Sequence, residues 1–376
     1  MKKFVSFCVP TLTLLITAFI ITARHSLIAA NAKGAETSLF SGPALEAFTA
    51  IRPIDAHAHA FKPDSSFYAI MGRLHLHILD ICVANRNDPS FPNLSSKIKA
   101  AKAFVKGSYG HAVLCTTFDP FKFSEAAFAK QAIEQLNADF ADGAVAVKIW
   151  KNIGMELKDS KGAFVLPDDP RFEPIYQEIA ARGKTLVAHL AEPDSCWQPP
   201  NKNSPDYSYY QEHPEWYMYT KPDHPSKQAI LQSRDRLLEK HPALRVVGAH
   251  LGSMETNVDE VARHLDRYPN FAVDAAARVI YLALQPREKV RQFLIKYQDR
   301  VLYATDLEFY PRQETEQSIA DWETRYMIDW KFFSSDAMVD YEGHKVRGLR
   351  LPEQVLRKIY HENAIRWIPG IIPNNP

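Results

Sequence analysis

Short apolar runs alternate with longer stretches of helical periodicity from residue 51 to residue 306. Within each run the apolar residues are nearly consecutive, which is typical of strands that are buried on both faces. The runs predict eight strands, at residues 52–58, 76–84, 111–118, 144–150, 185–191, 245–251, 271–277 and 300–307. The stretches between strands predict helices at residues 94–107, 124–143, 169–183, 225–242 and 286–297. This order predicts a parallel sheet covered by helices.

Eight repeats of strand and helix favour a closed (β/α)8 or TIM barrel of the α/β class over an open doubly wound sheet. No linker interrupts the pattern, so we expect a single domain at residues 45–370. The sequence of residues 310–345 predicts irregular and helical segments that cover the barrel. Residues 352–368 predict a closing helix with a proline in its first turn.

One long insertion breaks the periodicity. Residues 192–225 are rich in Pro, Tyr and Trp, and they follow the fifth predicted strand. A long unpatterned loop in a compact domain is usually functional. In a TIM barrel this loop would leave from the C-terminal face, where active sites lie. We therefore expect either an active-site lid or a loop for surface or subunit contacts.

The first residues differ from the rest of the chain. Lys2 and Lys3 precede about twenty mostly apolar residues, and small residues at 30–32 form a signal-peptidase pattern. We interpret residues 1–32 as an export signal that precedes the barrel. Because the apolar run reaches the ~20 residues that span a bilayer, an uncleaved membrane anchor is the alternative. Either way we expect an exported protein, periplasmic or extracellular, that contacts a membrane only through an uncleaved segment.

Composition narrows the possible partners. With 45 basic and 44 acidic residues, no basic surplus indicates a nucleic-acid partner. We expect a small-molecule substrate, and a homo-oligomer is compatible with the composition. After residue 32 the cysteines are Cys82, Cys115 and Cys196, too few for a disulfide framework. Cys82 and Cys115 lie in apolar runs, where we expect buried small side chains.

Two histidines of one parity end the first predicted strand, in the sequence "IDAHAH" at residues 54–59. Side chains two residues apart on a strand share a face and lie ~6.6 Å apart along it, so His57 and His59 can converge on one ion. The same spacing recurs at His75 and His77, but this second pair opens an apolar run. We therefore place the first pair at the C-terminal face of the barrel and the second pair at the opposite end.

Further ionisable residues accompany the apolar runs of other strands. His189, His250 and Asp306 end the fifth, sixth and eighth predicted strands, and Lys148 lies within the fourth. Burial of such groups is costly unless they are paired or bind a metal. Because the strands of a TIM barrel end at one face, we predict that these residues form one site with the first histidine pair.

The residue types of this site indicate metal chemistry. Imidazoles with one carboxylate suit Zn²⁺ or another divalent transition metal. Such an ion leaves a position for water and lowers the pKa of that water toward ~7. Asp306 would act as its base, and His250 would polarise or protonate the substrate. Lys148 either binds a substrate carboxylate or, when carbamylated, bridges two metals with His250 as a further ligand, so one or two ions fit.

Five segments together resemble the amidohydrolase superfamily, in particular its amidohydrolase-related branch (family 2) of metal-dependent TIM-barrel hydrolases. They are "DAHAH", "AHLAEP", "GAHLGS", "YATDLE" and "KIYHENAIRWI". The resemblance implies that the metal ligands are His57, His59, His189 and Asp306. It implies a catalytic or second-metal role for His250. Lys148 matches a position that is a carboxylated bridging lysine in some relatives, a role absent from the single-metal decarboxylases of the branch.

The resemblance leaves the reaction open, because the branch contains hydrolases and decarboxylases. Our first hypothesis is a hydrolase in which a metal-activated water attacks an amide, ester or lactone carbonyl. The alternative is a non-oxidative decarboxylase of an aromatic or muconate-like acid, and a third hypothesis is a barrel that binds a ligand without catalysis. Candidate substrate residues are Asp274, Arg278 and Trp150, with a structural salt bridge or ordinary packing as the alternative roles.

Overall fold

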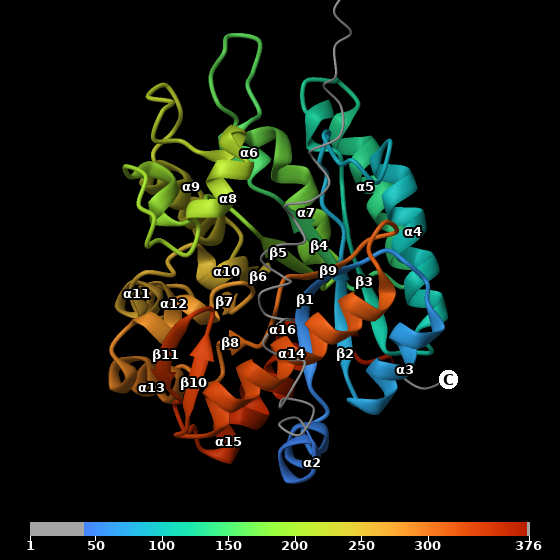
Figure 1. Cartoon of the computed structure of the whole chain (residues 1–376). Helices are drawn as coiled ribbons and strands as arrows, with labels where there is room; N and C mark the ends of the chain where they lie inside the picture. Colours follow the sequence, from blue (N-terminus) through green and yellow to red (C-terminus); the bar gives the residue numbers. More distant parts are fainter. Residues whose placement is uncertain (1–40, 374–376) are drawn as a thin grey trace, which may run out of the picture.

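The predicted strands form one parallel sheet in the centre of a computed structural model, which describes residues 41–373 (Figure 1). The strands follow one another in the order β8-β7-β6-β5-β4-β3-β2-β1-β9. Seven of them overlap the predicted ranges: β1 Ile54–Ala60, β2 His77–Ile81, β3 Ala112–Thr117, β4 Ala146–Ile149, β5 Thr185–Ala188, β6 Arg245–Gly248 and β7 Phe271–Asp274. The α/β class and the parallel order are therefore confirmed, whereas the export signal or anchor predicted at residues 1–32 lies outside the described residues.

The eighth predicted strand is divided into two short strands, β8 Val301–Leu302 and β9 Leu307–Phe309. Strand β8 pairs with β7 and strand β9 pairs with β1, so one chain segment joins the two ends of the sheet. Tyr303 lies between β8 and β9, and its carbonyl accepts the N–H of Ala56 in β1 at 3.0 Å. The break falls at Asp306, whose φ of 66° interrupts the extended backbone. The fold is TIM-barrel-like, with nine parallel strands over residues 41–373 instead of the eight predicted.

Helices cover the outside of the sheet, and those predicted between strands are present (Figure 1). They are α4 Leu94–Gly107, α5 Phe128–Ala141, α7 Glu173–Ala181, α9 Lys227–Lys240 and α13 Arg287–Lys296. Helix α4 matches its predicted range, and Asn93 and Ser96 close a capping box at its start. Helix α5 begins later than predicted, because residues 124–127 form turns that follow a 3₁₀ turn at Pro120–Lys122, capped by Asp119. Shorter helices complete the connections: α6 Asn152–Met155, α10 Ala249–Gly252, α11 Val258–Arg267 and α12 Val279–Leu284.

The segments outside the repeats differ most from prediction. Helices α2 Pro43–Ala50 and α3 Ser65–Arg73 were not predicted. Residues 310–345 contain the expected helix, α14 Thr315–Ser334, but also most of an antiparallel hairpin of β10 Met338–Tyr341 and β11 His344–Arg347. The closing helix is present in three parts: α15 Glu353–Arg357, a π turn at Lys358–Glu362 and α16 Asn363–Trp367.

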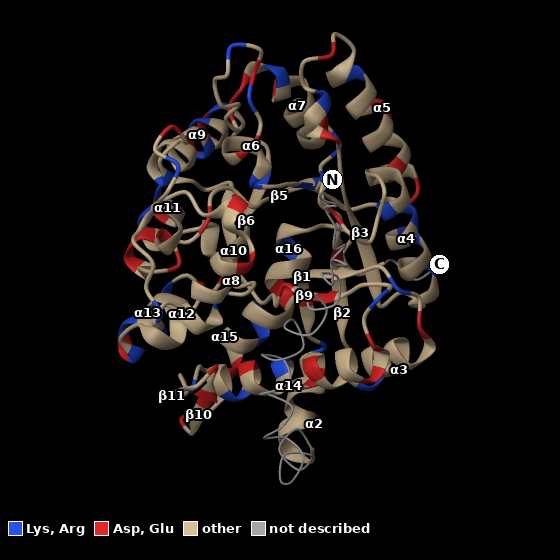
Figure 2. Ribbon diagram, turned by 45° about the horizontal axis from the view of Figure 1, so that its top comes forward, with Lys and Arg blue, Asp and Glu red and all other residues tan. Residues whose placement is uncertain are grey.

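The strands bury both of their faces, as the consecutive apolar residues predict. One apolar cluster fills the inside of the sheet and includes Ile54, Ala56, Leu79, Val113, Val187 and Val247. A larger cluster lies between the sheet and the helices and includes Ile78, Val147, Leu186 and Val246. Charged residues lie mainly on the covering helices and loops (Figure 2). A charged group on a strand is therefore an exception that needs a partner.

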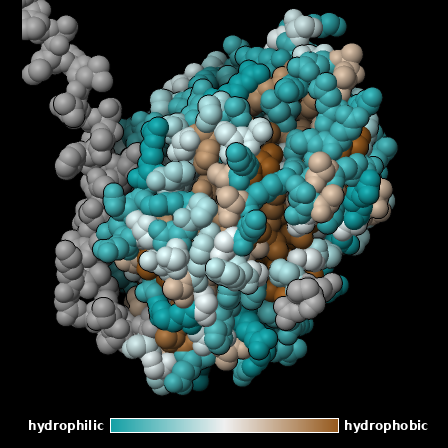
Figure 3. All heavy atoms as spheres, turned by 90° about the vertical axis from the view of Figure 1, so that its right-hand side faces the viewer, coloured by the Kyte–Doolittle hydropathy of each residue, from teal (hydrophilic) through white to brown (hydrophobic). Residues whose placement is uncertain are grey.

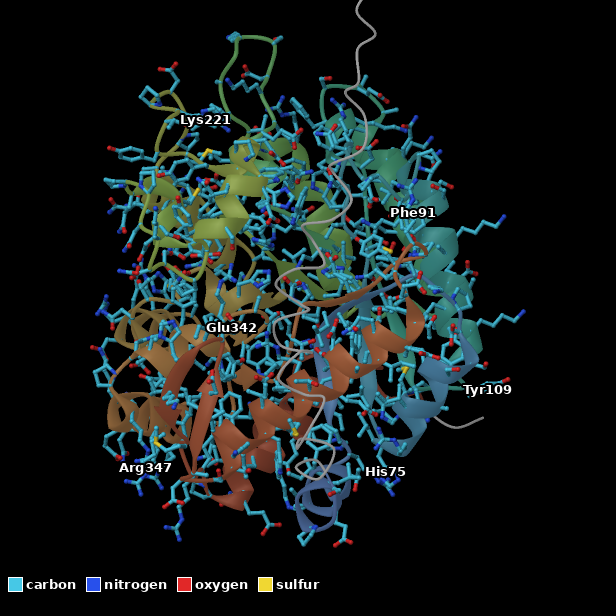
Figure 4. The ribbon with its side chains drawn as sticks, in the orientation of Figure 1. His75, Phe91, Tyr109, Lys221, Glu342 and Arg347 are labelled. Atoms are coloured by element: carbon cyan, nitrogen blue, oxygen red, sulfur yellow. The ribbon has the colours of Figure 1, made fainter. Side chains whose placement is uncertain are left out.

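The insertion and the second histidine pair lie at opposite ends of the molecule. Lys221 in the insertion and His75 mark these two ends in Figure 4. His77 opens β2 and pairs in register with Ile54 at the start of β1, which places this pair at the N-terminal ends of the strands, as predicted. The insertion contains only short helical segments: Asp194–Trp197, α8 Tyr207–Glu212 and Pro214–Trp216.

Cys82, Cys115 and Cys196 are free and buried, which confirms the predicted role of the first two as small core side chains. The face of the molecule seen in Figure 3 is mostly polar, with apolar side chains exposed between the polar ones. Within residues 41–373, none of the helices combines the length and the apolar character that a membrane crossing requires.

Candidate metal centre

Strand β1 and the break after β8 bring the predicted ligands together. Nε2 of His59 lies 3.2 Å from Oδ1 of Asp306, and Nε2 of His57 lies 3.3 Å from the same oxygen. The N–H of Asp306 donates to the carbonyl of His57 at 2.8 Å, so the left-handed turn at Asp306 aims its carboxylate at the histidines. Ligand atoms of these three residues all lie within 4.8 Å of one another, as in a metal site.

Hydrogen bonds fix the tautomer of both histidines. Nδ1 of His59 lies 2.7 Å from the carbonyl oxygen of Ile81, and Nδ1 of His57 lies 3.0 Å from Oδ2 of Asp274. A carbonyl oxygen and a carboxylate only accept, so each Nδ1 carries the proton. Burial, followed by the charge of Lys148, lowers the pKa of His57 and keeps its imidazole neutral. Nε2 of His57 therefore presents a lone pair.

These lone pairs are the evidence that the residues fit a metal ion. A neutral imidazole and a carboxylate oxygen face each other at 3.3 Å between His57 and Asp306, so two acceptors meet without a proton between them. The two acceptors repel each other, and a cation bound to both of them would remove that repulsion. Hydrogen bonds from the far ring nitrogens are typical of histidines that bind metals.

His189 has the same tautomer but a different position. Nδ1 of His250 lies 2.8 Å from the carbonyl of Ala276 and must donate, and burial lowers the pKa of His250 to about 3. Nε2 of His250 is thus an acceptor, so Nδ1 of His189, 3.1 Å away, donates to it. Nε2 of His189 is left with a lone pair, buried and without a partner in the described part of the chain. His189 is outside the three-residue group, and its predicted role as a metal ligand stays a prediction.

Lys148 lies beside the three ligands. Nζ of this β4 residue is 3.0 Å from Nε2 of His57. No carboxylate in residues 41–373 lies within 4.0 Å of Lys148, and burial lowers its pKa to about 8. The lysine thus lies next to His57, and both of its predicted roles stay predictions.

Asp274 lies behind the histidines. Oδ2 accepts from His57, and Oδ1 accepts the N–H of His250 at 2.8 Å and that of Ala276 at 3.1 Å. Burial alone would raise the pKa of Asp274, but the charge and hydrogen bond of His57 lower it. The carboxylate therefore orients two site histidines, and its predicted contact with substrate stays a prediction.

Asp55 was not predicted as a site residue, although it stands in the "IDAHAH" segment. Its Oδ1 accepts the N–H of His57 and that of Thr305, each at 3.1 Å, and its Oδ2 accepts the hydroxyl of Tyr326 at 3.0 Å. It ties the β1 ligands to the break that carries Asp306. The only hint in the sequence was its position two residues before His57. Its partner Thr305 is 250 residues further along the chain, so spacing could not predict this contact.

The insertion closes on the end of β4 around Lys151. Nζ of Lys151 pairs with Glu192 and lies 2.7 Å from the hydroxyl of Tyr209. The rings of Trp150 and Trp216 flank it, with their centroids 5.0 Å apart. The insertion thus contacts the C-terminal face, as predicted, and Trp150 packs in this aromatic group. A lid role and a substrate role for Trp150 stay predictions.

Comparisons with known proteins identify relatives of this arrangement. A family model described as Amidohydrolase matches residues 54–369. A search of curated proteins finds no match. Similar solved structures include an uncharacterized TIM-barrel protein from Bordetella bronchiseptica, with 18% identity, a TM-score of 0.47, and coverage of 85% of this chain and 99% of that one.

Two further structures are decarboxylases. The 2,6-dihydroxybenzoate decarboxylase from Rhizobium has 14% identity and a TM-score of 0.46, over 84% of this chain and 98% of that one. The 5-carboxyvanillate decarboxylase from Sphingomonas paucimobilis has 16% identity and a TM-score of 0.44, over 85% of this chain and 99% of that one. Likenesses this distant say nothing about the reaction of this chain.

Proposed function

The chain belongs to the amidohydrolase family, and on that premise we propose that it is a metal-dependent enzyme that decarboxylates a small organic acid. The observation that carries this proposal is Lys148. Its buried amine lies 3.0 Å from His57 and has no carboxylate partner in the part of the chain that the structure describes. A buried ammonium group without a carboxylate partner is costly, so an acid substrate would stabilise it.

His57, His59 and Asp306 would hold the metal, with His189 as a further ligand through its unpartnered Nε2. Histidine nitrogens and a carboxylate favour zinc or a similar divalent metal. When bound, such an ion supplies Lewis acidity that polarises a substrate oxygen. The protein's own part is to keep the two β1 imidazoles in one tautomer, through Ile81 and Asp274.

The proposed step breaks the bond between a substrate carbon and its carboxyl group. Carbon dioxide leaves, and the electron pair that stays on the carbon must take a proton. In this proposal the ammonium group of Lys148, 3.0 Å from Nε2 of His57, donates that proton as a general acid. Solvent then returns a proton to the lysine, which completes the cycle.

Hydrolysis is the second candidate, and one observation favours it. The side chain of Asp306 is 31% exposed, whereas those of His57 and His59 are 1% and 8% exposed, so water can reach this carboxylate. Asp306 would take a proton from water as that water attacks an amide, ester or lactone carbonyl. Lys148 would then protonate the leaving group.

The test uses the natively purified protein with its metal counted. Incubation with aromatic and muconate-like acids in heavy water should release carbon dioxide and place one deuterium on the vacated carbon. A chelator should abolish the reaction, and zinc should restore it. Products that contain the atoms of water, without carbon dioxide, would instead support hydrolysis. A protein that holds no metal and turns over no acid, amide, ester or lactone would contradict both and support a barrel that only binds a ligand.

Lys148→Met tests the proton donor, because methionine keeps the length of the side chain and removes the amine. We expect turnover to fall about 100-fold or more, the usual contribution of a general acid, with unchanged metal content. Lys184→Met is the matched control. The amine of Lys184 donates to the carbonyl of Ala144, and both residues lie at the N-terminal ends of β5 and β4, away from the site histidines. Equal turnover of the two variants would remove Lys148 from the mechanism.

A further inference from the structure

Arg278 is a charged residue at the C-terminal face whose guanidinium group has few contacts. It follows β7 and directly precedes α12. Its Nη1 donates to the carbonyl of Ala277 at 3.0 Å, and its Nε is buried without a hydrogen-bond partner within residues 41–373. No carboxylate in those residues lies within 4.0 Å of it. Arginine normally binds carboxylates through two parallel hydrogen bonds, which this geometry leaves unused.

The acidic residues around Arg278 already have other partners. Glu192 pairs with Lys151, and Glu255 lies 3.3 Å from Nζ of Lys227. Asp206 accepts the hydroxyl of Ser195 at 2.7 Å and that of Tyr281. Burial alone would lower the pKa of Arg278, but the charges of Asp206, Glu255 and Glu192 raise it, although none of these carboxylates lies within 4.0 Å of the guanidinium.

The loop that carries Arg278 also builds the metal centre. Asp274, the last residue of β7, accepts from His57 and from the N–H of His250, and in the loop the carbonyl of Ala276 accepts from Nδ1 of His250. Arg278 is two residues further on. Lys148 of β4 lies 3.0 Å from Nε2 of His57, and Arg278 follows the segment that accepts from His57 and His250. Two cations without a carboxylate contact therefore belong to elements that hold the site histidines.

We propose that Arg278 binds a second carboxylate of the substrate, so that the substrate class is a dicarboxylic or more highly charged organic acid. One carboxylate lies at the metal centre beside Lys148, and the other meets Nε and Nη of Arg278. This inference rests on the proposed function, because it assumes an acid substrate. It goes further by assigning the number of acid groups and the residue that distinguishes them.

A structural role for Arg278 makes a different prediction. If the guanidinium only held the insertion through the charge of Asp206, then its substitution would change stability, but not the relative affinity for acids with one and two carboxylates. The preference between matched acids is therefore the quantity to measure.

The experiment measures equilibrium binding to the zinc-loaded protein by calorimetry. The probes are pairs that share a skeleton and differ by one carboxylate: benzoate with isophthalate and with terephthalate, and butyrate with glutarate. For at least one pair, we expect the dicarboxylate to bind the wild-type protein about tenfold tighter or more, from one charge-assisted contact. Equal affinity within every pair, or no binding of any probe, would overturn the proposal.

Variants assign the preference to the residue. Arg278→Gln should lose the preference for the dicarboxylate while the affinity for the monocarboxylate stays within about twofold, and Arg278→Lys should regain part of it. Arg86→Gln is the charge-matched control: Arg86 lies on the loop after β2 and stacks on Phe121, 3.9 Å from the ring centroid. An unchanged preference in Arg278→Gln would refute the assignment. Failure of carbon dioxide release with an intact preference would refute the proposed reaction alone.

Discussion

At the scale of the residue, the proton on Nδ1 decides what each histidine can do. The acceptor oxygens of Ile81, Asp274 and Ala276 cannot donate a hydrogen bond, so each holds the proton on the Nδ1 atom of its histidine. The Nε2 atoms of His59 and His57 then face Asp306, and that of His250 faces His189. Of these acceptors only Asp274 is a side chain, so only this one can be changed by substitution without moving the backbone.

Asp274→Asn should therefore weaken metal binding without removing a ligand. The amide can keep accepting the N–H of His250, but its NH2 group would then face Nδ1 of His57 and favour the other tautomer, with the proton on Nε2. We expect zinc affinity to fall about 10- to 100-fold, as for other groups that orient metal ligands. Competition with a chromophoric chelator measures it.

Asp139→Asn serves as the control for that substitution, because Asp139 is buried and accepts the hydroxyl of Thr116 at 2.6 Å, without a contact to any of the site histidines. If both variants bind zinc as tightly as the wild-type protein, then the tautomer of His57 does not depend on Asp274.

Spacing and strand parity predicted the residues that share the site, but not how they are held. His57, His59 and Asp306 follow from their places at strand ends. The role of Asp274 as a support for His57 could not be predicted, because 217 residues separate them and a contact between neighbouring side chains leaves no periodic signal. The same holds for Asp55 with Tyr326, which are 271 residues apart.

At the scale of the element, the turn after β6 shows how tightly the strands meet the loops of the site. His250 and Leu251 have φ values of 60° and 56°, so the predicted strand stops at Gly248. A Cβ on Gly248 would lie 2.5 Å from the ring of Phe271 and 3.0 Å from Cα of Gly252. Only glycine fits between β6 and β7 at this point.

Gly248→Ala should destabilise the protein by about 1–3 kcal/mol, the usual cost of overpacking a filled core. Gly72→Ala is the matched control, since a Cβ there meets nothing within 4 Å inside helix α3, where alanine is the better helix former. Denaturant unfolding of both variants measures the difference. Equal stabilities would show that the β6 turn relaxes to accept a side chain.

Helix α14 adds a titratable contact between elements. The carboxyl group of Asp329 accepts the hydroxyl of Tyr303 at 2.9 Å and that of Tyr341 in β10 at 2.6 Å, and burial raises its pKa to about 6. The unfolded chain loses this proton near its ordinary pKa of 3.8, whereas the folded chain keeps it to about pH 6. Between these values the folded state binds more protons, so stability falls as the pH rises.

The wild-type protein should therefore lose roughly 2 kcal/mol of unfolding free energy between pH 4 and pH 6.5 relative to Asp329→Asn, most of the effect of a pKa difference of about two units. Paired denaturant titrations at several pH values give the difference directly. A difference that does not change with pH would mean that Asp329 ionises as it does in the unfolded chain.

Periodicity predicted the repeated elements and failed outside them. The strands are recognisable because both faces are buried, and helix α4 because its cap is explicit. The hairpin of β10 and β11 was missed, since its strands are short and three of the four residues of β11 are exposed. The eighth strand was predicted as continuous, because the left-handed turn at Asp306 carries no glycine to mark it.

At the scale of the whole molecule, export remains a prediction that one measurement addresses. If residues 1–32 are a cleaved signal, then the secreted or periplasmic protein begins at Lys33, because the small residues at 30–32 precede it. The intact mass of the protein recovered from the host's export fraction should match residues 33–376. A chain that keeps its first residues and sediments with membranes would support the anchor.

The join between β1 and the segment at 301–309 also sets the order of assembly. His59 and Asp306 are 247 residues apart, so the centre exists only when the first and the last strands of the sheet have met. Loops of this length close late in folding. A nascent chain that has not reached Asp306 offers the ion only the incomplete pair on β1. An ion that binds these three residues together would therefore stabilise only a chain that extends at least to Asp306 and whose first and last strands have paired.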